Sequence, residues 1–155
     1  MEYKGVLIII IIAIVTAIAL MILALLVKLP ASRFVTQTLK TRNANIHVFV
    51  ADTLIKRQAG LSGWSSLDDN TGMLFLFPKA NIPVFWMKGM KFPLDVVWIY
   101  NNHVVDISYN IPPPDGGVPA TMKPSQAVDE VLEINAGQAN ALDIHIGDTV
   151  TIGEK

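Results

Sequence analysis

The segment FWMKGMKFPLDVVWIY, residues 85–100, contains the strongest β-strand signal of the chain together with its most unusual polar residue. Its second half, Leu94–Tyr100, is a run of apolar and aromatic residues of the kind that packs well on a pleated sheet. Because side chains alternate along a strand, Asp95 shares one face with Val97 and Ile99, and both faces are apolar. We therefore predict a buried strand that carries a carboxylate in need of hydrogen bonds or a cation.

Short strand-like runs flank this segment on both sides, and turn-forming residues separate them. Asn101-Asn102 is expected to join two strands as a hairpin. The proline- and glycine-rich stretch 111–124 is expected to form a long loop. Strands are predicted over residues 46–52, 73–77, 84–87, 94–100, 103–110, 127–134 and 149–152.

Two short helices interrupt the strands. The first is predicted to begin after Asp52 or Thr53 and to end at Gly60, and the second to run from an Asn135 cap to about Leu142. The pattern is typical of a mainly β protein with two short helices, folded as a compact β-sandwich or barrel-like domain.

Residues 6–27 contain no charged side chain and consist mostly of Ile, Leu, Ala and Val. As a helix they would span roughly 33 Å, enough for a hydrocarbon core of about 30 Å. We therefore predict a transmembrane signal anchor over residues 1–28, a polar connector over 29–45 and a β-rich domain over 46–155. The connector reads as a helical extension or an unstructured spacer, and cleavage of a signal peptide near Ala31 is the alternative to an anchor.

The charge pattern bears on partners and on membrane orientation. A net charge of −1 and a pI near 6.3 leave no basic surface for nucleic acid. Basic residues are more numerous after the apolar run than before it, which favours a cytoplasmic domain. The residues concerned are Lys28, Arg33, Lys40 and Arg42 after the run and Lys4 before it.

The sequence predicts neither a metal site nor a cofactor. It contains no cysteine, which excludes disulfides and thiolate chemistry. His47, His103 and His145 lack the spacing of a metal site. No phosphate-binding glycine loop or GxSxG nucleophile motif is present.

Several short blocks occur in an order that resembles the domain of unknown function 192 family. They are Ala51-Asp52-Thr53, Gly60-Leu61, Gly72-Met73-Leu74-Phe75, Phe85-Trp86-Met87-Lys88, Pro93-Leu94-Asp95, Val131-Leu132-Glu133, Ala136-Gly137 and Gly147-Asp148. The resemblance covers about residues 46–152. It implies a compact β-rich domain, often exported or membrane-anchored, without an established activity, and so favours a domain outside the cytoplasm.

This chain departs from the family pattern at two places. Gly89 and Met90 follow Lys88 where the family tends to have Asn and Thr, and the loop 112–124 lacks the Cys that many members carry. Any chemistry that relatives perform with those side chains is missing here.

Asp95 has two interpretations. It is either a structural carboxylate that ties the turn Lys88–Phe92, or part of a ligand site walled by Trp86 and Trp98. Asp95 is expected either to accept hydrogen bonds from backbone amides or to pair with a cation, for which Lys88 is the leading candidate and Lys91 the second.

Glu133 lies in an equally apolar strand, just before the second predicted helix. The positive end of the helix dipole stabilises a carboxylate at such a position. A local structural role is one interpretation, and pairing with Asp95 for acid–base hydrolysis is another. The expected function is a non-catalytic module of the cell envelope that binds a small ligand, a glycan or a protein. A hydrolase that uses Asp95 and Glu133, and a structural or assembly protein, are the alternatives.

Overall fold

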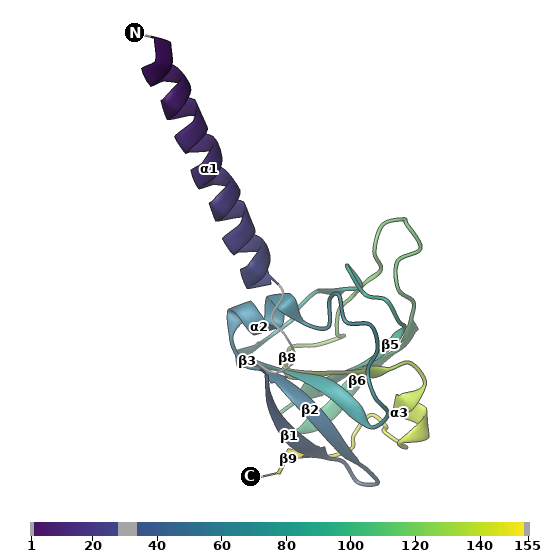
Figure 1. The fold of residues 1–155 in the computed structure, drawn as a ribbon. Helices are drawn as coiled ribbons and strands as arrows, with labels where there is room; N and C mark the ends of the chain where they lie inside the picture. The colour runs from purple at the N-terminus through teal and green to yellow at the C-terminus, as the bar shows by residue number, and fades with distance from the viewer. Residues whose placement is uncertain (1, 28–33, 154–155) are drawn as a thin grey trace. The chain divides into compact units, whose positions relative to one another are not determined.

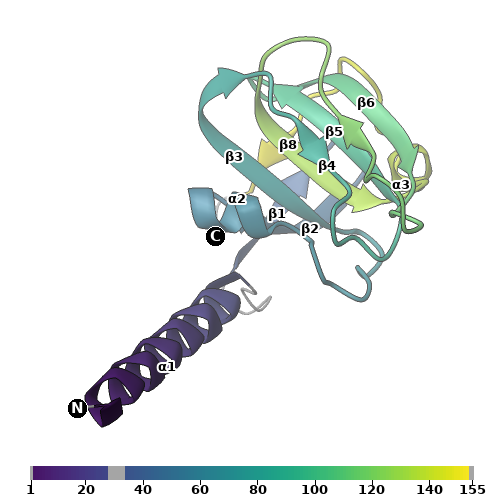
Figure 2. The ribbon, with the colours of Figure 1, turned by 90° about the horizontal axis from the view of Figure 1, so that it is seen from above.

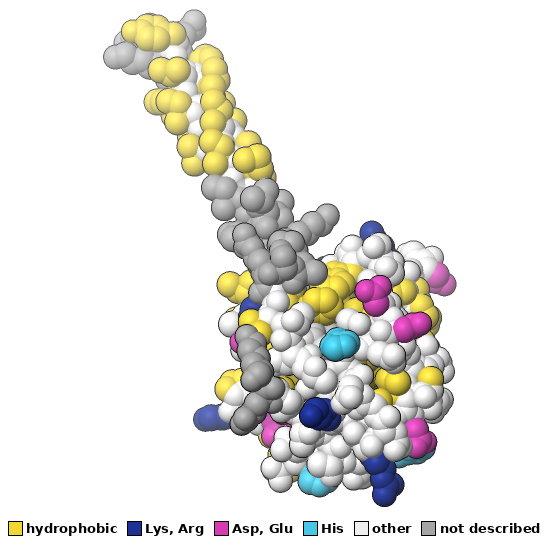
Figure 3. Space-filling model, turned by 60° about the horizontal axis from the view of Figure 1, so that its bottom comes forward, with side chains coloured by type: hydrophobic (Ala, Val, Ile, Leu, Met, Phe, Trp, Pro, Cys, Tyr) yellow, Lys and Arg dark blue, Asp and Glu magenta, His cyan; other side chains and the backbone are white. Residues whose placement is uncertain are grey.

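The computed structural model of the 155-residue chain describes residues 2–27 and 34–153. It divides into two compact units, Met1–Pro30 and Ala31–Lys155. The first contains helix α1, Glu2–Val27, whose described side chains are exposed and mostly apolar (Figure 3). None of the helices in the described part of the chain meets the combined length and hydropathy requirement for crossing a membrane.

The second unit is built mainly of β-strands (Figures 1 and 2). Seven strands form one sheet in the order β6-β5-β8-β3-β2-β1-β9, and β4 pairs with β7 in a separate two-stranded sheet. The elements are β1 (Val35–Lys40), β2 (Asn45–Ala51), α2 (Leu54–Ala59), β3 (Thr71–Asn81), β4 (Phe85–Trp86), β5 (Leu94–Tyr100), β6 (His103–Ile111), β7 (Thr121–Met122), β8 (Val128–Asn135), α3 (Gln138–Ala141) and β9 (Thr151–Ile152).

Local sequence explains two of the connections. Asn101 and Asn102 have φ angles of 49° and 61°, a left-handed pair that Asn tolerates and that gives a tight hairpin between β5 and β6. Helix α2 begins where the Thr53 hydroxyl accepts a hydrogen bond from the Lys56 amide at 3.3 Å, and it ends at Gly60. Both features confirm the sequence prediction.

The seven-stranded sheet curls so that its two edges approach each other. Strand β9 pairs with β1 at one edge, and the residues just before β9 bond to the start of β6 at the other edge. The Val104 amide donates to the Asp148 carbonyl at 2.9 Å, and the Gly147 amide donates to the Val104 carbonyl at 2.8 Å. The predicted β-rich fold is thus confirmed, and its form is that of a half-barrel.

The two faces of the sheet have different neighbours. The concave side holds the main core, which includes Val50, Leu74, Val97, Leu132 and Ile134. The pairing registers place Phe49, Met73, Glu133 and Val96 in one row on the opposite side, with Phe75, Val131 and Trp98 in the next row. This second face carries the candidate site.

Two predicted boundaries are wrong. The sheet begins with β1 at Val35, inside the predicted connector 29–45, of which residues 29–33 lie outside the described residues. Asn135 does not cap α3. It is the last residue of β8, its side-chain amide donates to the Leu67 carbonyl at 2.7 Å, and the cap position belongs to Gly137 with φ 84°.

Candidate functional site

Asp95 is a structural carboxylate. Its side chain is fully buried and accepts hydrogen bonds from the amides of Asn110 at 2.8 Å and Ala139 at 3.0 Å. It therefore joins the end of β6 to helix α3 on the concave side of the sheet. Of the two expected kinds of partner, backbone amides are therefore the ones present, and among the described residues neither Asp95 nor Lys88 forms a salt bridge.

Asp95 and Glu133 point to opposite faces of the sheet. Asp95 is paired with Ile134 across the β5–β8 ladder, whereas Glu133 is paired with Val96. Paired residues share a face and successive residues alternate, so the two carboxyl groups are separated by the sheet itself. The hypothesis of paired catalytic carboxylates is therefore wrong, since those groups must face a common substrate.

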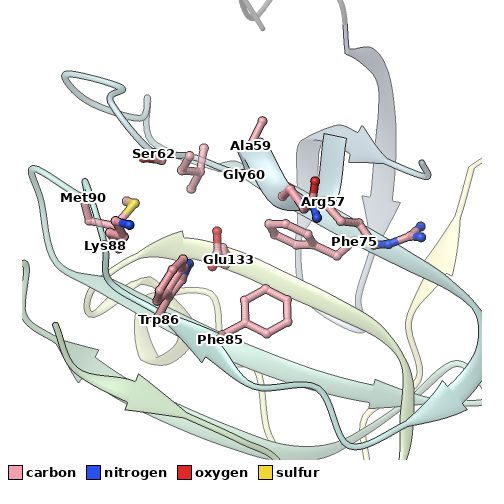
Figure 4. A pocket seen from close by; sticks show the side chains of 12 residues that line it. Arg57, Ala59, Gly60, Ser62, Phe75, Phe85, Trp86, Lys88, Met90 and Glu133 are labelled. Atoms are coloured by element: carbon pink, nitrogen blue, oxygen red, sulfur yellow. The ribbon is translucent and has the colours of Figure 1, made fainter. Parts of the chain in front are cut away.

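Glu133 forms the floor of a small pocket on the outer face. Figure 4 shows its carboxyl group between Trp86 and Phe85 on one side and Ala59, Gly60 and Ser62 on the other. The pocket has a volume of about 50 Å³. We call this pocket the Glu133 slot.

The Glu133 carboxyl group has no protein partner in the part of the chain that the structure describes. Glu133 as a whole is only 6% exposed to solvent. Burial alone raises the pKa of Glu133 to about 8, because removing water disfavours the charged form and no neighbouring cation or donor offsets this effect. At neutral pH the group is therefore mostly a neutral carboxylic acid, able both to donate and to accept a hydrogen bond.

One wall of the slot is an exposed aromatic ring next to a cation. Trp86 is 58% exposed, and the Lys88 ammonium nitrogen lies 4.9 Å from its ring centroid. This cation–π distance is within the usual range for an attractive contact. Arg57 also lines the slot, but its guanidinium group donates to the carbonyls of Asp52 and Leu76, so its position is fixed by the backbone.

Two glycine-containing loops form the rim of the slot. The Gly63 amide donates to the Gly89 carbonyl at 2.9 Å, which ties residues 60–63 to residues 87–90. Gly89 has φ 73°, and a Cβ at this position would lie 2.3 Å from the Ser62 hydroxyl. The departure from the family pattern at Gly89 thus fits a close contact between loops, and Met90 is a buried wall of the same slot.

A larger apolar groove adjoins the slot. It has a volume of about 330 Å³ and includes Leu54, Phe77 and Val84. Arg57, Gln58, Phe75, Phe85 and Trp86 line both hollows. A ligand can therefore place a small end group in the slot and a longer apolar part in the groove.

The structure brings together three of the five predicted site residues, namely Trp86, Lys88 and Glu133. Asp95 lies on the other face. Trp98 is buried, donates from its indole nitrogen to the Ser108 hydroxyl at 3.0 Å and packs against Phe85 instead of lining the slot. The sequence did not predict that residues 57–62 line the slot. It predicted only that Gly60 ends the first short helix.

No group of three potential metal-ligating side chains occurs within the described ranges 2–27 and 34–153. The residues at the slot include one carboxyl group, that of Glu133, and no histidine, cysteine or second acidic residue beside it. The chemistry that the slot supports is hydrogen bonding and aromatic contact.

Comparisons with known proteins show a shared fold and an unassigned function. The chain is similar to a crystal structure of a protein from Sinorhizobium meliloti 1021 that is described as a candidate transcription regulator, with 26% identity and a TM-score of 0.71 over 77% of this chain and 95% of that one. It is also similar to a protein of unknown function from Novosphingobium aromaticivorans, with 28% identity and a TM-score of 0.66 over 76% of this chain and 84% of that one.

No curated protein matches the chain. A family model does match it over residues 35–152. The matched region begins at the first residue of β1 and includes the two rim loops of the slot, residues 60–63 and 87–90. The family is described as uncharacterised. The chain belongs to the domain of unknown function 192 family.

Proposed function

We propose that the domain is a binding module that takes the polar end of a small ligand, most simply a glycan, into the Glu133 slot. The observation that carries this proposal is the buried Glu133 carboxyl group, which has no hydrogen-bond partner within the described chain and faces an open hollow. Among the described residues Gln138 Oε1, and not Glu133, is the fully enclosed side-chain atom without a partner, so the Glu133 oxygens open onto the hollow. A ligand hydroxyl group in the slot would give the Glu133 carboxyl group a hydrogen bond.

The size of the slot limits what enters it. The slot, at about 50 Å³, is much smaller than the adjoining groove of about 330 Å³, so it takes an end group of a ligand and not the whole ligand. A hydroxyl or hydroxymethyl group fits this description, and the exposed face of Trp86 offers a surface on which the apolar side of a sugar ring can stack. The rest of the ligand would lie in the adjoining groove.

We also propose that residues 6–27 anchor the chain in a membrane and that the domain lies outside the cytoplasm. This part of the proposal rests on the sequence, which has 22 consecutive residues without a charge, and not on the helices of the structure. Two of the basic residues that favoured the opposite orientation belong to the folded domain, since Lys40 ends β1 and Arg42 lies in the turn after it. They are therefore weaker evidence of a cytoplasmic flank.

Nucleic acid is not part of the proposal. The Sinorhizobium relative is described as a candidate regulator of transcription. The present chain has a net charge of −1, whereas proteins that bind the phosphate backbone usually present a strongly basic surface. An envelope glycan or the side chain of an envelope protein suits the slot better.

A ligand screen read out at Trp86 tests the proposed site. The full chain, labelled with nitrogen-15 and held in a mild detergent, would be titrated with neutral mono- and disaccharides while the tryptophan indole resonances are recorded. We expect a saturable shift of the Trp86 resonance. We expect Glu133→Leu, which removes the hydrogen-bonding group, to weaken that binding by about ten-fold, the value of one lost hydrogen bond.

Glu130→Leu is the matched control, because Glu130 lies on the same strand, is half-buried and does not line the slot. It should bind with the affinity of the wild type. Equal affinity in all three proteins would contradict the assignment of Glu133. A complete lack of response to sugars, with the domain folded, would favour the structural or assembly role instead.

A further inference from the structure

We infer that one end of the domain, formed by the start of α2 and the loop after β3, docks on the surface of an anionic lipid bilayer. The inference rests on the proposed membrane anchor and adds a second, peripheral contact to it. The surface consists of five apolar side chains, Leu54, Ile55, Ile82, Val84 and Trp86, which we call the α2 rim.

The α2 rim is unusually apolar for a free surface. Its five side chains are between 54% and 68% exposed. Helix α2 contributes no buried residue at all, so Leu54 and Ile55 do not help to fill the core. Leu54, Val84 and Trp86 line the same groove, which shows that the two segments are neighbours. Clustered exposed apolar side chains of this kind mark interaction sites.

The α2 rim lies at the end of the sheet where the chain enters the domain. Val35, the first residue of β1, is paired with Val50 near the end of β2, and α2 begins at Leu54 only a few residues later. Strand β3 runs parallel to β2 with Phe75 opposite Ala51, so its later residues extend beyond the same end and lead into the loop that carries Val84.

The chain length keeps this end close to the proposed anchor. Eight residue steps separate Val27 from Val35, which is 35 − 27 in the numbering of the chain. Even a fully extended chain covers only about 28 Å in eight steps. If residues 6–27 cross a bilayer, this connection sets an upper limit of about 28 Å on the distance from the anchor to the start of β1.

The charges around the α2 rim fit an anionic surface. Lys56 and Arg57 follow the apolar pair on α2, Lys79 precedes Ile82 and Lys88 follows Trp86. The nearby Asp52 carboxylate is paired with Lys56 at 2.8 Å. Basic residues near anionic headgroups strengthen membrane binding, and tryptophan favours the interface between headgroups and acyl chains.

Bilayer contact at the α2 rim has a consequence for the proposed site. The groove at the rim shares Phe75, Phe85 and Trp86 with the Glu133 slot. Docking would therefore place the mouth of the slot at headgroup level. A membrane ligand with a hydroxyl-bearing end and an apolar part could then place its polar end in the slot and its apolar part in the groove.

Single cysteines test the docking, because the natural chain has none. The variants Val84→Cys, Ile146→Cys and Ile14→Cys of the full chain would each carry an NBD fluorophore in vesicles of phosphatidylcholine and phosphatidylglycerol. Lipids brominated near the headgroup end of their acyl chains serve as quenchers for the Val84 and Ile146 labels, and lipids brominated near the end of the chains serve for the Ile14 label, which lies well inside the apolar run 6–27. Ile146 is the matched control, since it is an aliphatic residue 65% exposed that lies beside the segment bonded to Val104, away from the α2 rim.

We expect quenching at Val84 to be at least about three-fold stronger than at Ile146, because apolar contact faces lie about 5–10 Å into the headgroup boundary. The Ile14 label reports the anchor separately. Quenching at Ile14 with equal, weak quenching at Val84 and Ile146 would overturn the docking while the anchor stands. Absence of quenching at Ile14 would refute the anchor, and the docking inference with it.

Discussion

Replacing Glu133 by Gln should change how the stability of the protein depends on pH. The substitution keeps the shape of the side chain but removes its titration. Burial raises the pKa of Glu133 from 4.5 to about 8, a difference of 8 − 4.5 = 3.5 units. At about 1.36 kcal/mol per unit, the wild-type free energy of unfolding should fall by roughly 5 kcal/mol across that interval.

The sign follows from the protons bound in each state. Below about pH 4.5 the carboxyl group is protonated in both the folded and the unfolded chain, so it has no effect on stability. As the pH rises, the unfolded chain loses its proton while the folded chain keeps it, and the folded state becomes less stable. The loss ends above about pH 8, where both states are ionised. The Gln variant does not show this loss of stability, because its side chain does not titrate.

Urea unfolding of the full chain in a mild detergent, followed by tryptophan fluorescence between about pH 4 and about pH 9, measures the effect. Glu130 and the other carboxylates titrate in both proteins, so the difference between wild type and variant isolates Glu133. Relative to the wild type, the free energy of unfolding of the variant should increase by up to about 1.4 kcal/mol per pH unit. Parallel stability curves across the whole range would refute the reasoning.

Three further substitutions test the fold and the site. Asp95→Ala leaves two buried amides without an acceptor and should lower the free energy of unfolding by about 2–5 kcal/mol, whereas a loss below about 1 kcal/mol in urea unfolding would contradict the structural role. Gly72→Ala places a Cβ 2.8 Å from the Glu133 carbonyl oxygen and should cost about 1–3 kcal/mol; an unchanged melting temperature would show that the strands separate easily. Trp86→Ala should change stability by less than about 1 kcal/mol because the ring is largely exposed, yet abolish sugar binding as measured by calorimetry, and retained binding would exclude the ring from the site.

The sequence predicted the central strands well because their signals are local. Strand β5 is Leu94–Tyr100 as expected, since an uninterrupted apolar run is bounded by Pro93 on one side and a hairpin turn on the other. Strand β1, VTQTLK, was missed because its composition is polar and its conformation depends on pairing with β2. Pairing of that kind is a tertiary interaction that no local pattern reports.

The candidate site was predictable only in part. Both Asp95 and Glu133 were expected to be buried carboxylates, and both are buried. Their separation onto opposite faces depends on the register between β5 and β8, which one sequence does not specify. The wall formed by residues 59–62 was missed for a similar reason, because it meets the loop after β4 through tertiary contacts such as the hydrogen bond between Gly63 and Gly89.

A carbon-13 titration of the Glu133 carboxyl group is the decisive experiment. The resonance is assigned in the full chain by its loss in Glu133→Gln, and its shift is followed as the pH is raised. A buried carboxyl group that faces the slot without a protein partner should titrate with a midpoint of about 8. A midpoint near the ordinary value of 4.5 would show that the group is hydrated or already partnered, and the slot would no longer be a site that awaits a ligand.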